Sequence, residues 1–168
     1  MGTRSKVGGR ELFYLKLLGE VLEVEAYWKD GYLIRLDLRM RSRERPDGEI
    51  EGIPPSGLKE GLMAVLDGAD PRNIVPAEVR GSLFQIKVWT ALLTAAPYAT
   101  VLTYGGFAER LGCGSPRSVG QALKANPLPL LVPCHRVVGK NGWLGGYSCG
   151  IEIKRLLLRY ECEMGGLR

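Results

Sequence analysis

A cysteine and a histidine stand side by side in the second half of the chain. Cys134 is followed by His135, the only histidine among the 168 residues, and then by Arg136. Because a cysteine attacks as its thiolate, a nucleophilic cysteine needs a nearby base or cation. Neighbouring residues of a strand point to opposite faces, so contact between Cys134 and His135 requires a bend or a bridging water. The pair is a candidate nucleophilic site, and the alternative is a buried, inert cysteine.

The flanking residues indicate how this pair is held. Residues 130–132 are apolar and predict a short buried strand that ends at Cys134 and holds the thiol rigidly. Residues typical of turns lie on both sides of the pair and allow the backbone to approach a ligand closely. They are Asn126, Pro127 and Pro129 before it, and Gly139, Asn141, Gly142, Gly145 and Gly146 after it. This composition predicts a shaped pocket.

The remaining cysteines suggest neither a metal site nor a disulfide framework. Cys113, Cys149 and Cys162 form no CxxC pair with one another or with Cys134. With a single histidine, a zinc site would depend on cysteines and carboxylates whose spacing matches no familiar pattern. We therefore expect no metal and no cofactor, and structural roles for these three cysteines.

Three helices are predicted before the Cys-His pair. Residues 82–95 show helical spacing of Leu83, Ile86, Trp89 and Leu93 after Ser82, a possible N-cap, and end before a proline. Residues 103–112 and 115–126 are short and amphipathic, and a Gly-Cys-Gly turn joins them, which is typical of a helix-turn-helix.

The second helix of this motif begins with a strong capping signal and carries only basic charges. Ser115 is the predicted N-cap and Pro116 the first helical residue. Arg117 lies in the first turn and Lys124 near the end of the helix. Residues 82–168 contain 10 basic and 4 acidic residues, whereas residues 1–81 contain 13 basic and 14 acidic ones. The second half therefore carries a charge of +6 against −1, which favours a polyanionic partner.

The first half predicts a small α/β unit. Residues 21–40 alternate around a Lys-Asp-Gly turn, which predicts a hairpin. Ile34, Leu36, Leu38 and Met40 are predicted to face the core, and Arg35, Asp37 and Arg39 to face water. Residues 1–10 are expected to be a loose tail, residues 41–57 a loop, and residues 57–70 to contain a helix capped by Ser56. The segment 71–82 is a candidate linker, so we place two domains at 1–81 and 82–168.

No part of the sequence predicts a membrane segment. A membrane-spanning helix needs about 20 consecutive apolar residues, and the chain has no such run and no recognisable secretory leader. We expect a cytoplasmic protein with no membrane partner. No coiled-coil pattern is present, so we expect a monomer.

The motif Pro133-Cys134-His135-Arg136-Val137 resembles that of the O6-alkylguanine-DNA alkyltransferase family. It is preceded by Asn126-Pro127 and followed by Gly145-Gly146-Tyr147-Ser148, as in that family. The resemblance covers residues 82–162. It implies a ribonuclease-H-like α/β N-terminal domain and a mainly α, winged-helix-like C-terminal domain with a helix-turn-helix.

The resemblance also implies an activity. Cys134 would accept the alkyl group of O6-alkylguanine, and of O4-alkylthymine, irreversibly and once per molecule. His135 would act through a water as general base, and Glu161 would orient it. Asn126 would shape the pocket, and Tyr104 would support the displaced nucleotide and protonate the leaving guanine.

DNA contacts follow from the same resemblance. The helix-turn-helix would enter the minor groove of double-stranded DNA, and Arg117 would fill the gap that the displaced nucleotide leaves. Further implied DNA contacts are Tyr104, Ser115, Lys124 and Arg136, and implied pocket residues are Val137, Gly145, Gly146, Tyr147 and Ser148.

The same residues are also compatible with two other functions. Alkyltransferase-like proteins bind the same lesion without repairing it, but they lack the acceptor cysteine, which is present here as Cys134. A cysteine hydrolase would use the same types of residue in Cys134, His135 and Glu161. The direct adjacency of cysteine and histidine, together with Arg117, argues against it.

Overall fold

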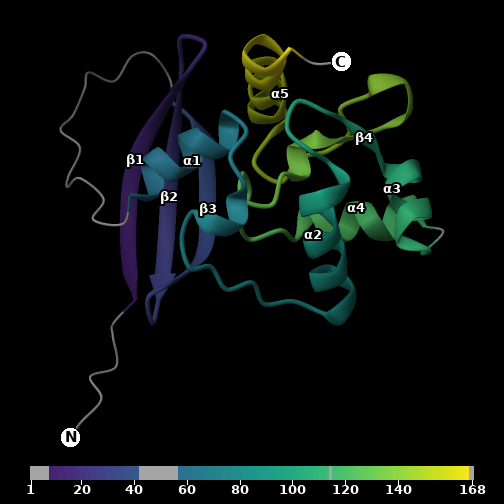
Figure 1. The fold of residues 1–168 in the computed structure, drawn as a ribbon, viewed down its shortest axis with the longest axis horizontal. Coiled ribbons are helices and arrows are strands. Elements are labelled where there is room, and N and C mark those ends of the chain that lie inside the picture. The colour runs from purple at the N-terminus through teal and green to yellow at the C-terminus, as the bar shows by residue number, and fades with distance from the viewer. Residues whose placement is uncertain (1–7, 42–56, 114, 167–168) are drawn as a thin grey trace, which may run out of the picture.

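A three-stranded antiparallel sheet begins the part of the chain that the structure, a computed structural model, describes: residues 8–41, 57–113 and 115–166. The strands β1 (Gly9–Leu17), β2 (Glu20–Lys29) and β3 (Tyr32–Met40) lie in this order (Figure 1). Two-residue turns connect them, and all four turn residues have positive φ. That is type I′ geometry, which fits the twist of a hairpin.

The predicted hairpin is confirmed as β2 and β3, but the sheet has a strand more than we predicted. β1 pairs with β2 along its whole length, from Gly9 opposite Trp28 to Leu17 opposite Glu20. The expectation of a loose tail was therefore wrong for Gly9 and Arg10, which are part of β1, whereas residues 1–7 lie outside the described residues.

A bulge in β3 changes which of its residues face the core. Tyr27 pairs with Arg35 but Trp28 pairs with Leu33, so Ile34 is the extra residue. One extra residue reverses the alternation of a strand, and Leu33 is fully buried where Ile34 was predicted. The predictions for Ile34, which is only half-buried, and for Met40, which is 37% exposed, were wrong.

Helices α1 (Leu58–Leu66) and α5 (Ile151–Gly165) complete the core of the sheet. The helix predicted within residues 57–70 is confirmed as α1, whose N-cap position is held by Gly57, while Ser56 and residues 42–56 lie outside the described residues. This core includes residues from both halves of the sequence. The second half contributes Leu128, Leu130, Leu131, Ile153, Leu156, Leu157 and Tyr160.

The predicted linker, residues 71–82, forms backbone hydrogen bonds with the free edge of β3. After a 3₁₀ turn at Pro71–Asn73, Leu33 donates its backbone N–H to Pro76 and accepts one from Glu78. Further along the same edge, Leu36 donates to the carbonyl of Pro127. The edge of β3 therefore binds the linker and also the segment that leads to Cys134.

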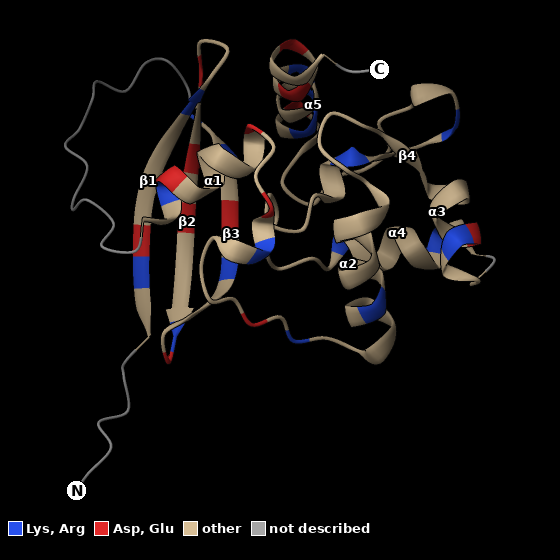
Figure 2. Ribbon diagram, viewed as in Figure 1, with Lys and Arg blue, Asp and Glu red and all other residues tan. Residues whose placement is uncertain are grey.

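Besides α5, the described part of the second half contains three α-helices and a pair of two-residue strands. Helix α2 (Leu83–Ala95) is followed by α3 (Tyr104–Leu111) and α4 (Pro116–Lys124), while β4 (Leu102–Thr103) pairs in parallel with β5 (Val137–Val138). The predicted caps Ser82 and Ser115 both accept backbone N–H groups of their helices. Figure 2 shows mixed charges on the sheet, whereas the charged residues of α4 are basic.

The face of α2 that packs inward differs from the predicted one. Val88, Trp89 and Leu92 are buried, while Leu83 is 90% exposed. Leu83 is the first helical residue, so the predicted stripe was wrong at its start. Within the described residues, no helix is long and apolar enough to cross a membrane.

The first prediction concerns the capping box of α2. Ser82 accepts from the N–H of Gln85, whose side chain in turn accepts from the N–H of Ser82. Ser82→Ala removes the hydroxyl that accepts from the N–H of Gln85 and is expected to lower the free energy of unfolding by about 1 kcal/mol. Leu83→Ala, at an exposed neighbouring position, is the control and is expected to change it by less than about 0.5 kcal/mol. Urea unfolding measures both, and equal values for the two variants would contradict the cap.

Candidate active site

Cys134 begins a 3₁₀ turn that comprises Cys134–Arg136. The strand predicted at residues 130–132 is not formed, although all three residues are buried as expected. Leu130 instead has a φ of 76° and lies in a turn that is closed by a bridge between Pro129 and Val132. Proline lacks the N–H group that a strand ladder requires, which explains the turn. The bend also supplies the departure from strand geometry that the Cys-His pair requires.

The side chain of Asn126 holds this turn together. Its amide nitrogen donates to the carbonyl of Val132 at 3.0 Å and to Sγ of Cys134 at 3.1 Å. Its amide oxygen accepts from the N–H of Leu128 at 3.0 Å. The predicted role of Asn126 in shaping the pocket therefore has a specific form, a direct hydrogen bond to the sulfur.

Burial keeps the thiol of Cys134 protonated at rest. The residue is 4% exposed, and burial raises its pKa to about 11, although the hydrogen bond from Asn126 acts in the opposite direction. An ordinary cysteine has a pKa of about 8.5. A reaction at neutral pH therefore has to remove the proton from Sγ.

His135, Arg136 and Glu161 form a buried charged cluster behind Cys134. Nε2 of His135 lies 2.9 Å from Oε1 of Glu161, and Nε and Nη2 of Arg136 donate to the same carboxylate. Burial lowers the pKa of His135, which favours its neutral form. Burial would raise the pKa of Glu161, but the bonds from His135 and Arg136 outweigh it and lower the pKa.

The second ring nitrogen of His135 is available for chemistry. If Nε2 carries the proton and donates it to Glu161, Nδ1 is an acceptor. Nδ1 is buried, and no group among the described residues forms a hydrogen bond with it. A neutral imidazole with a free acceptor nitrogen next to Cys134 is suited to accept a proton.

The structure corrects the predicted role of Arg136. We expected Arg136 to contact DNA, but its side chain is 7% exposed and Nη1 donates to the carbonyl of Ala96 at 3.0 Å. Its Nε and Nη2 donate to Glu161, and the guanidinium carbon lies 5.8 Å from the centre of the Tyr98 ring. An arginine paired in this way neutralises a buried carboxylate and cannot reach a phosphate, so Arg136 positions Glu161.

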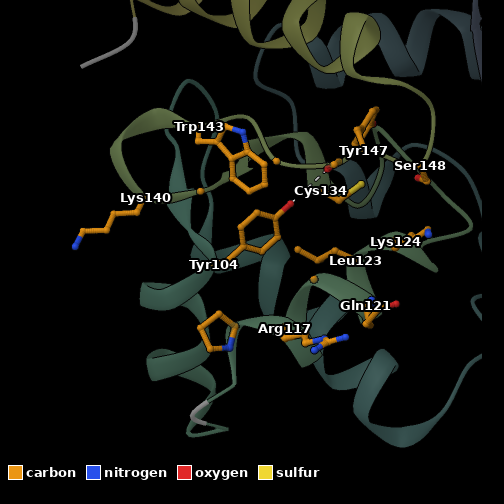
Figure 3. Close-up of a pocket in the computed structure, with 15 residues that line it drawn as sticks. Tyr104, Arg117, Gln121, Leu123, Lys124, Cys134, Lys140, Trp143, Tyr147 and Ser148 are labelled. Atoms are coloured by element: carbon orange, nitrogen blue, oxygen red, sulfur yellow. Dashed lines mark hydrogen bonds between the residues drawn. The ribbon is translucent and has the colours of Figure 1, made fainter.

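A cavity of about 630 Å³ opens next to Cys134 (Figure 3). Helix α4 lines one side with Arg117 and Lys124, and Tyr104 and the loop after β5 line the other. The structure thus brings together most of the predicted site. The predicted residues that line the cavity are Cys134, Tyr104, Arg117, Lys124, Gly145, Gly146, Tyr147 and Ser148.

The other predicted residues lie behind the cavity wall or at its edge. Val137 is fully buried, and Ser115 is engaged as the N-cap of α4, where its hydroxyl accepts from the N–H of Ser118. Asn126 forms a hydrogen bond with Cys134 in the cavity wall, and His135 follows Cys134 in the same 3₁₀ turn. Ser115 is therefore placed to fix the start of the basic helix rather than to line the pocket.

Tyr104 and the loop of Gly145 approach each other closely. The hydroxyl of Tyr104 donates to the carbonyl of Gly146 at 3.5 Å, and burial raises the pKa of Tyr104. Gly145 has a φ of 69°, and a Cβ atom at this position would lie 3.2 Å from the Tyr104 ring. Both the conformation and the space therefore require glycine here.

Lys154 is a site residue whose role the sequence analysis did not identify. It is fully buried, and Nζ donates to the carbonyls of Val137 at 2.6 Å and Leu144 at 2.5 Å. Nζ also lies 5.7 Å from the centre of the Tyr104 ring, and burial lowers the pKa of Lys154 to about 8. The sequence analysis predicted no helix over residues 151–165, so it gave no reason to expect a buried lysine next to Ile153. Lys154 ties α5 to both ends of the pocket loop.

The described residues hold no cluster of three or more His, Cys, Asp or Glu side chains that could bind a metal ion. All four cysteines are free thiols. The cavity itself is lined by the thiol of Cys134 and by two tyrosines, Tyr104 and Tyr147.

Comparison with known sequences assigns this half of the chain to a known domain type. Residues 83–163 match the family model described as 6-O-methylguanine DNA methyltransferase, DNA binding domain. The methylated-DNA–protein-cysteine methyltransferase of Mycobacterium tuberculosis H37Rv is 44% identical over 107 residues, which are 63% of this chain and 64% of that protein. The chain thus spans less than two thirds of that relative. The methyltransferase of the same name from Shigella flexneri is 38% identical over 150 residues, 88% of this chain and 78% of that protein.

Solved structures of similar proteins extend the likeness to the first half. The O6-methylguanine-DNA methyltransferase of Pyrococcus kodakaraensis has a TM-score of 0.74 and 28% identity, with 91% of this chain and 99% of that chain covered. The Mycobacterium tuberculosis protein OGT, solved in complex with DNA, has a TM-score of 0.66 and 31% identity, with 92% and 93% covered. This chain therefore shares the fold of these two structures, a small antiparallel sheet with helices.

The second prediction concerns the buried carboxylate. Glu161→Gln removes the negative charge that compensates Arg136, so we expect it to lower the free energy of unfolding by about 3–5 kcal/mol. Glu152→Gln removes one partner of an exposed ion pair with Arg155 and is the matched control. It is expected to cost less than about 1 kcal/mol. Urea unfolding at neutral pH compares the two, and similar small losses would show that the cluster contributes little.

The third prediction concerns pH. Unfolded His135 takes up a proton below about pH 6.5, whereas the lowered pKa of the folded state keeps the buried ring neutral. Stability is therefore expected to fall as the pH drops below about 6.5, by up to about 1.4 kcal/mol per pH unit. The lowered pKa of Glu161 adds a second loss below about pH 4.3.

Urea unfolding between pH 8 and 5 measures the first of these losses. His135→Gln removes the only histidine of the chain, so the variant is expected to show a flat profile in this range. An equal slope in the variant and the wild type would assign the dependence to other groups.

Proposed function

This chain belongs to the O6-methylguanine-DNA methyltransferase family, and we propose that it repairs O6-alkylguanine in double-stranded DNA by transferring the alkyl group to Cys134. The observation that carries this proposal is the position of one buried thiol in a cavity with basic residues at its edge. Sγ accepts a hydrogen bond from Asn126, and the neutral ring of His135 lies next in the chain.

The proposed reaction begins with removal of the thiol proton. Nδ1 of His135 takes it from Sγ through a bridging water, and Glu161 stabilises the imidazolium that forms. The hydrogen bond from Asn126 stabilises the thiolate. These steps explain how a thiol whose pKa is about 11 can react at neutral pH.

The thiolate then attacks the alkyl carbon. A bond forms between this carbon and Sγ while the bond to O6 breaks, and its electron pair stays on the guanine. Tyr104 donates a proton to the leaving guanine, a role that its raised pKa supports because the phenol stays protonated. The products are unmodified guanine and a thioether at Cys134. A thioether is a poor leaving group, so each molecule reacts once.

Nucleotide displacement follows from the burial of Cys134. An alkyl group on a stacked base cannot reach a thiol that is 4% exposed, so the nucleotide has to rotate into the cavity. Arg117, on the cavity side of α4, fills the gap in the duplex, and Lys124 contacts the backbone. We propose that α4 enters the minor groove and binds with little dependence on sequence.

The finer parts of the assignment rest on the family. O4-alkylthymine carries its alkyl group on an exocyclic oxygen as well, and we include it as a substrate. We further propose a monomer of two domains, 1–81 with a ribonuclease-H-like fold and 82–168 with a winged-helix-like fold. A cysteine hydrolase is less consistent with the site, because the hydrogen bond to Sγ of Cys134 comes from Asn126 and not from His135.

The fourth prediction tests the transfer itself. The protein is mixed with duplex DNA that contains one O6-methylguanine, and its intact mass and tryptic peptides are measured. We expect the wild type to gain the mass of one methyl group on Cys134, with no more than one per molecule, and the DNA to contain restored guanine. Cys134→Ser is expected to bind the same DNA without gaining mass. Binding by the wild type without a gain in mass would favour a lesion-binding protein instead.

A further inference from the structure

The rim of the cavity carries a large aromatic side chain that the proposed reaction does not use. Trp143 lines the cavity and is 71% exposed, whereas Trp89 is 2% exposed and Trp28 is half-buried. Its position on the rim places it outside both hydrophobic cores. An exposed indole at the entrance of a cavity is a candidate contact for a ligand with flat rings.

The loop that carries Trp143 is held in one conformation. Gly139 donates its N–H to the carbonyl of Trp143 at 2.5 Å, and Trp143 donates to Lys140. Asn141 and Gly142, with φ of 59° and 75°, make the reversal. A Cβ atom on Gly139 would lie 2.6 Å from the indole ring, so the ring packs directly on this glycine. The indole is thus oriented before any ligand binds.

The charges around the cavity indicate what such a ligand carries. Lys140 lies beside Trp143 on the rim, and Arg117 and Lys124 belong to α4 (Figure 3). In Figure 3, Tyr104 lies between the Trp143 loop and Arg117. The residues that line the cavity include three basic side chains and no acidic one. Basic side chains that alternate with an exposed aromatic ring are the features that bind a single strand of nucleic acid.

Covalent continuity places a DNA strand on this rim. A nucleotide that has rotated into the cavity stays joined to both neighbours, so the lesion-bearing strand has to cross the rim. The neighbouring bases also lose a stacking partner when the nucleotide leaves. Arg117 on α4 is placed on one side of the cavity, and the loop of Trp143 faces it from another side.

We propose that Trp143 and Lys140 form a second DNA contact, an inference that rests on the proposed function and extends it. The indole stacks on a nucleotide next to the displaced one, and Lys140 binds a phosphate of the same strand. Trp143 is a positioning residue, because it holds the strand and does not touch the reacting atoms.

The fifth prediction tests this contact with three variants and a control variant. Trp143→Ala is expected to weaken binding to duplex DNA with one O6-methylguanine about tenfold, and Trp143→Phe, which keeps a flat ring, to restore most of the affinity. Met164→Ala, at an exposed apolar position that does not line the cavity, is the control and is expected to bind as the wild type does. Lys140→Gln is expected to reduce the dependence of binding on salt by about one phosphate contact.

A second readout separates a DNA contact from a structural role. Methyl transfer from the free base O6-methylguanine needs Cys134 and the cavity but no strand on the rim, so Trp143→Ala is expected to slow it much less than it slows methyl transfer from duplex DNA. Acrylamide quenching of the wild-type protein mainly reports on Trp143, the most exposed tryptophan, and bound DNA is expected to protect it.

Each outcome has a defined meaning. Unchanged DNA affinity of Trp143→Ala, or quenching that DNA does not alter, would overturn the second contact while leaving alkyl transfer in place. An equal loss of both reactions would overturn it as well, since Trp143 would then support the cavity itself. Failure of the wild type to react with either substrate would instead overturn the proposed function.

Discussion

The structure of the site depends on one buried carboxylate. Glu161, on α5, has no exposed surface, and a buried charge is tolerated only where it is paired and hydrogen-bonded. His135 and Arg136 provide these bonds, and both belong to the turn that begins with Cys134. The need to satisfy Glu161 therefore fixes the turn, and the turn determines where the sulfur lies.

The same helix controls the other wall of the cavity. Lys154 lies seven residues before Glu161, about two turns of α5, so the two side chains leave the helix on the same side. Glu161 binds the turn of Cys134, whereas Lys154 binds the carbonyls on both sides of the loop that carries Trp143. A single rigid helix thus sets the distance between the nucleophile and the loop.

Much of this arrangement was predictable from local patterns, and the exceptions have physical causes. The helix caps at Ser82 and Ser115 and the hairpin turn depend on a few adjacent residues, and they were predicted correctly. The bulge at Ile34 was missed because it depends on pairing with another strand. The turn at Leu130 was missed because an apolar triplet suits a buried turn as well as a strand.

Among the site residues, too, those that depend on local sequence were predicted and those that depend on distant contacts were not. The Cys-His pair and the basic helix could be recognised from residue type and spacing. Arg136 was assigned to DNA from the resemblance, whereas its burial depends on Glu161, which is distant in sequence. Lys154 was overlooked as a site residue for the same reason, since its partners are backbone carbonyls that no sequence pattern reveals.

The shared core has a consequence for how the chain can be divided. Leu128, Leu130 and the apolar face of α5 pack against the sheet, and Leu36 holds the backbone of Pro127. A fragment restricted to residues 82–168 would leave this apolar surface in water and the turn of Cys134 without its anchor. The sheet contributes no side chain to the lining of the cavity, yet the position of Cys134 depends on it. A gene fusion or a minimal version of the protein therefore has to retain the whole three-stranded sheet, even though the recognisable motifs all lie in the second half.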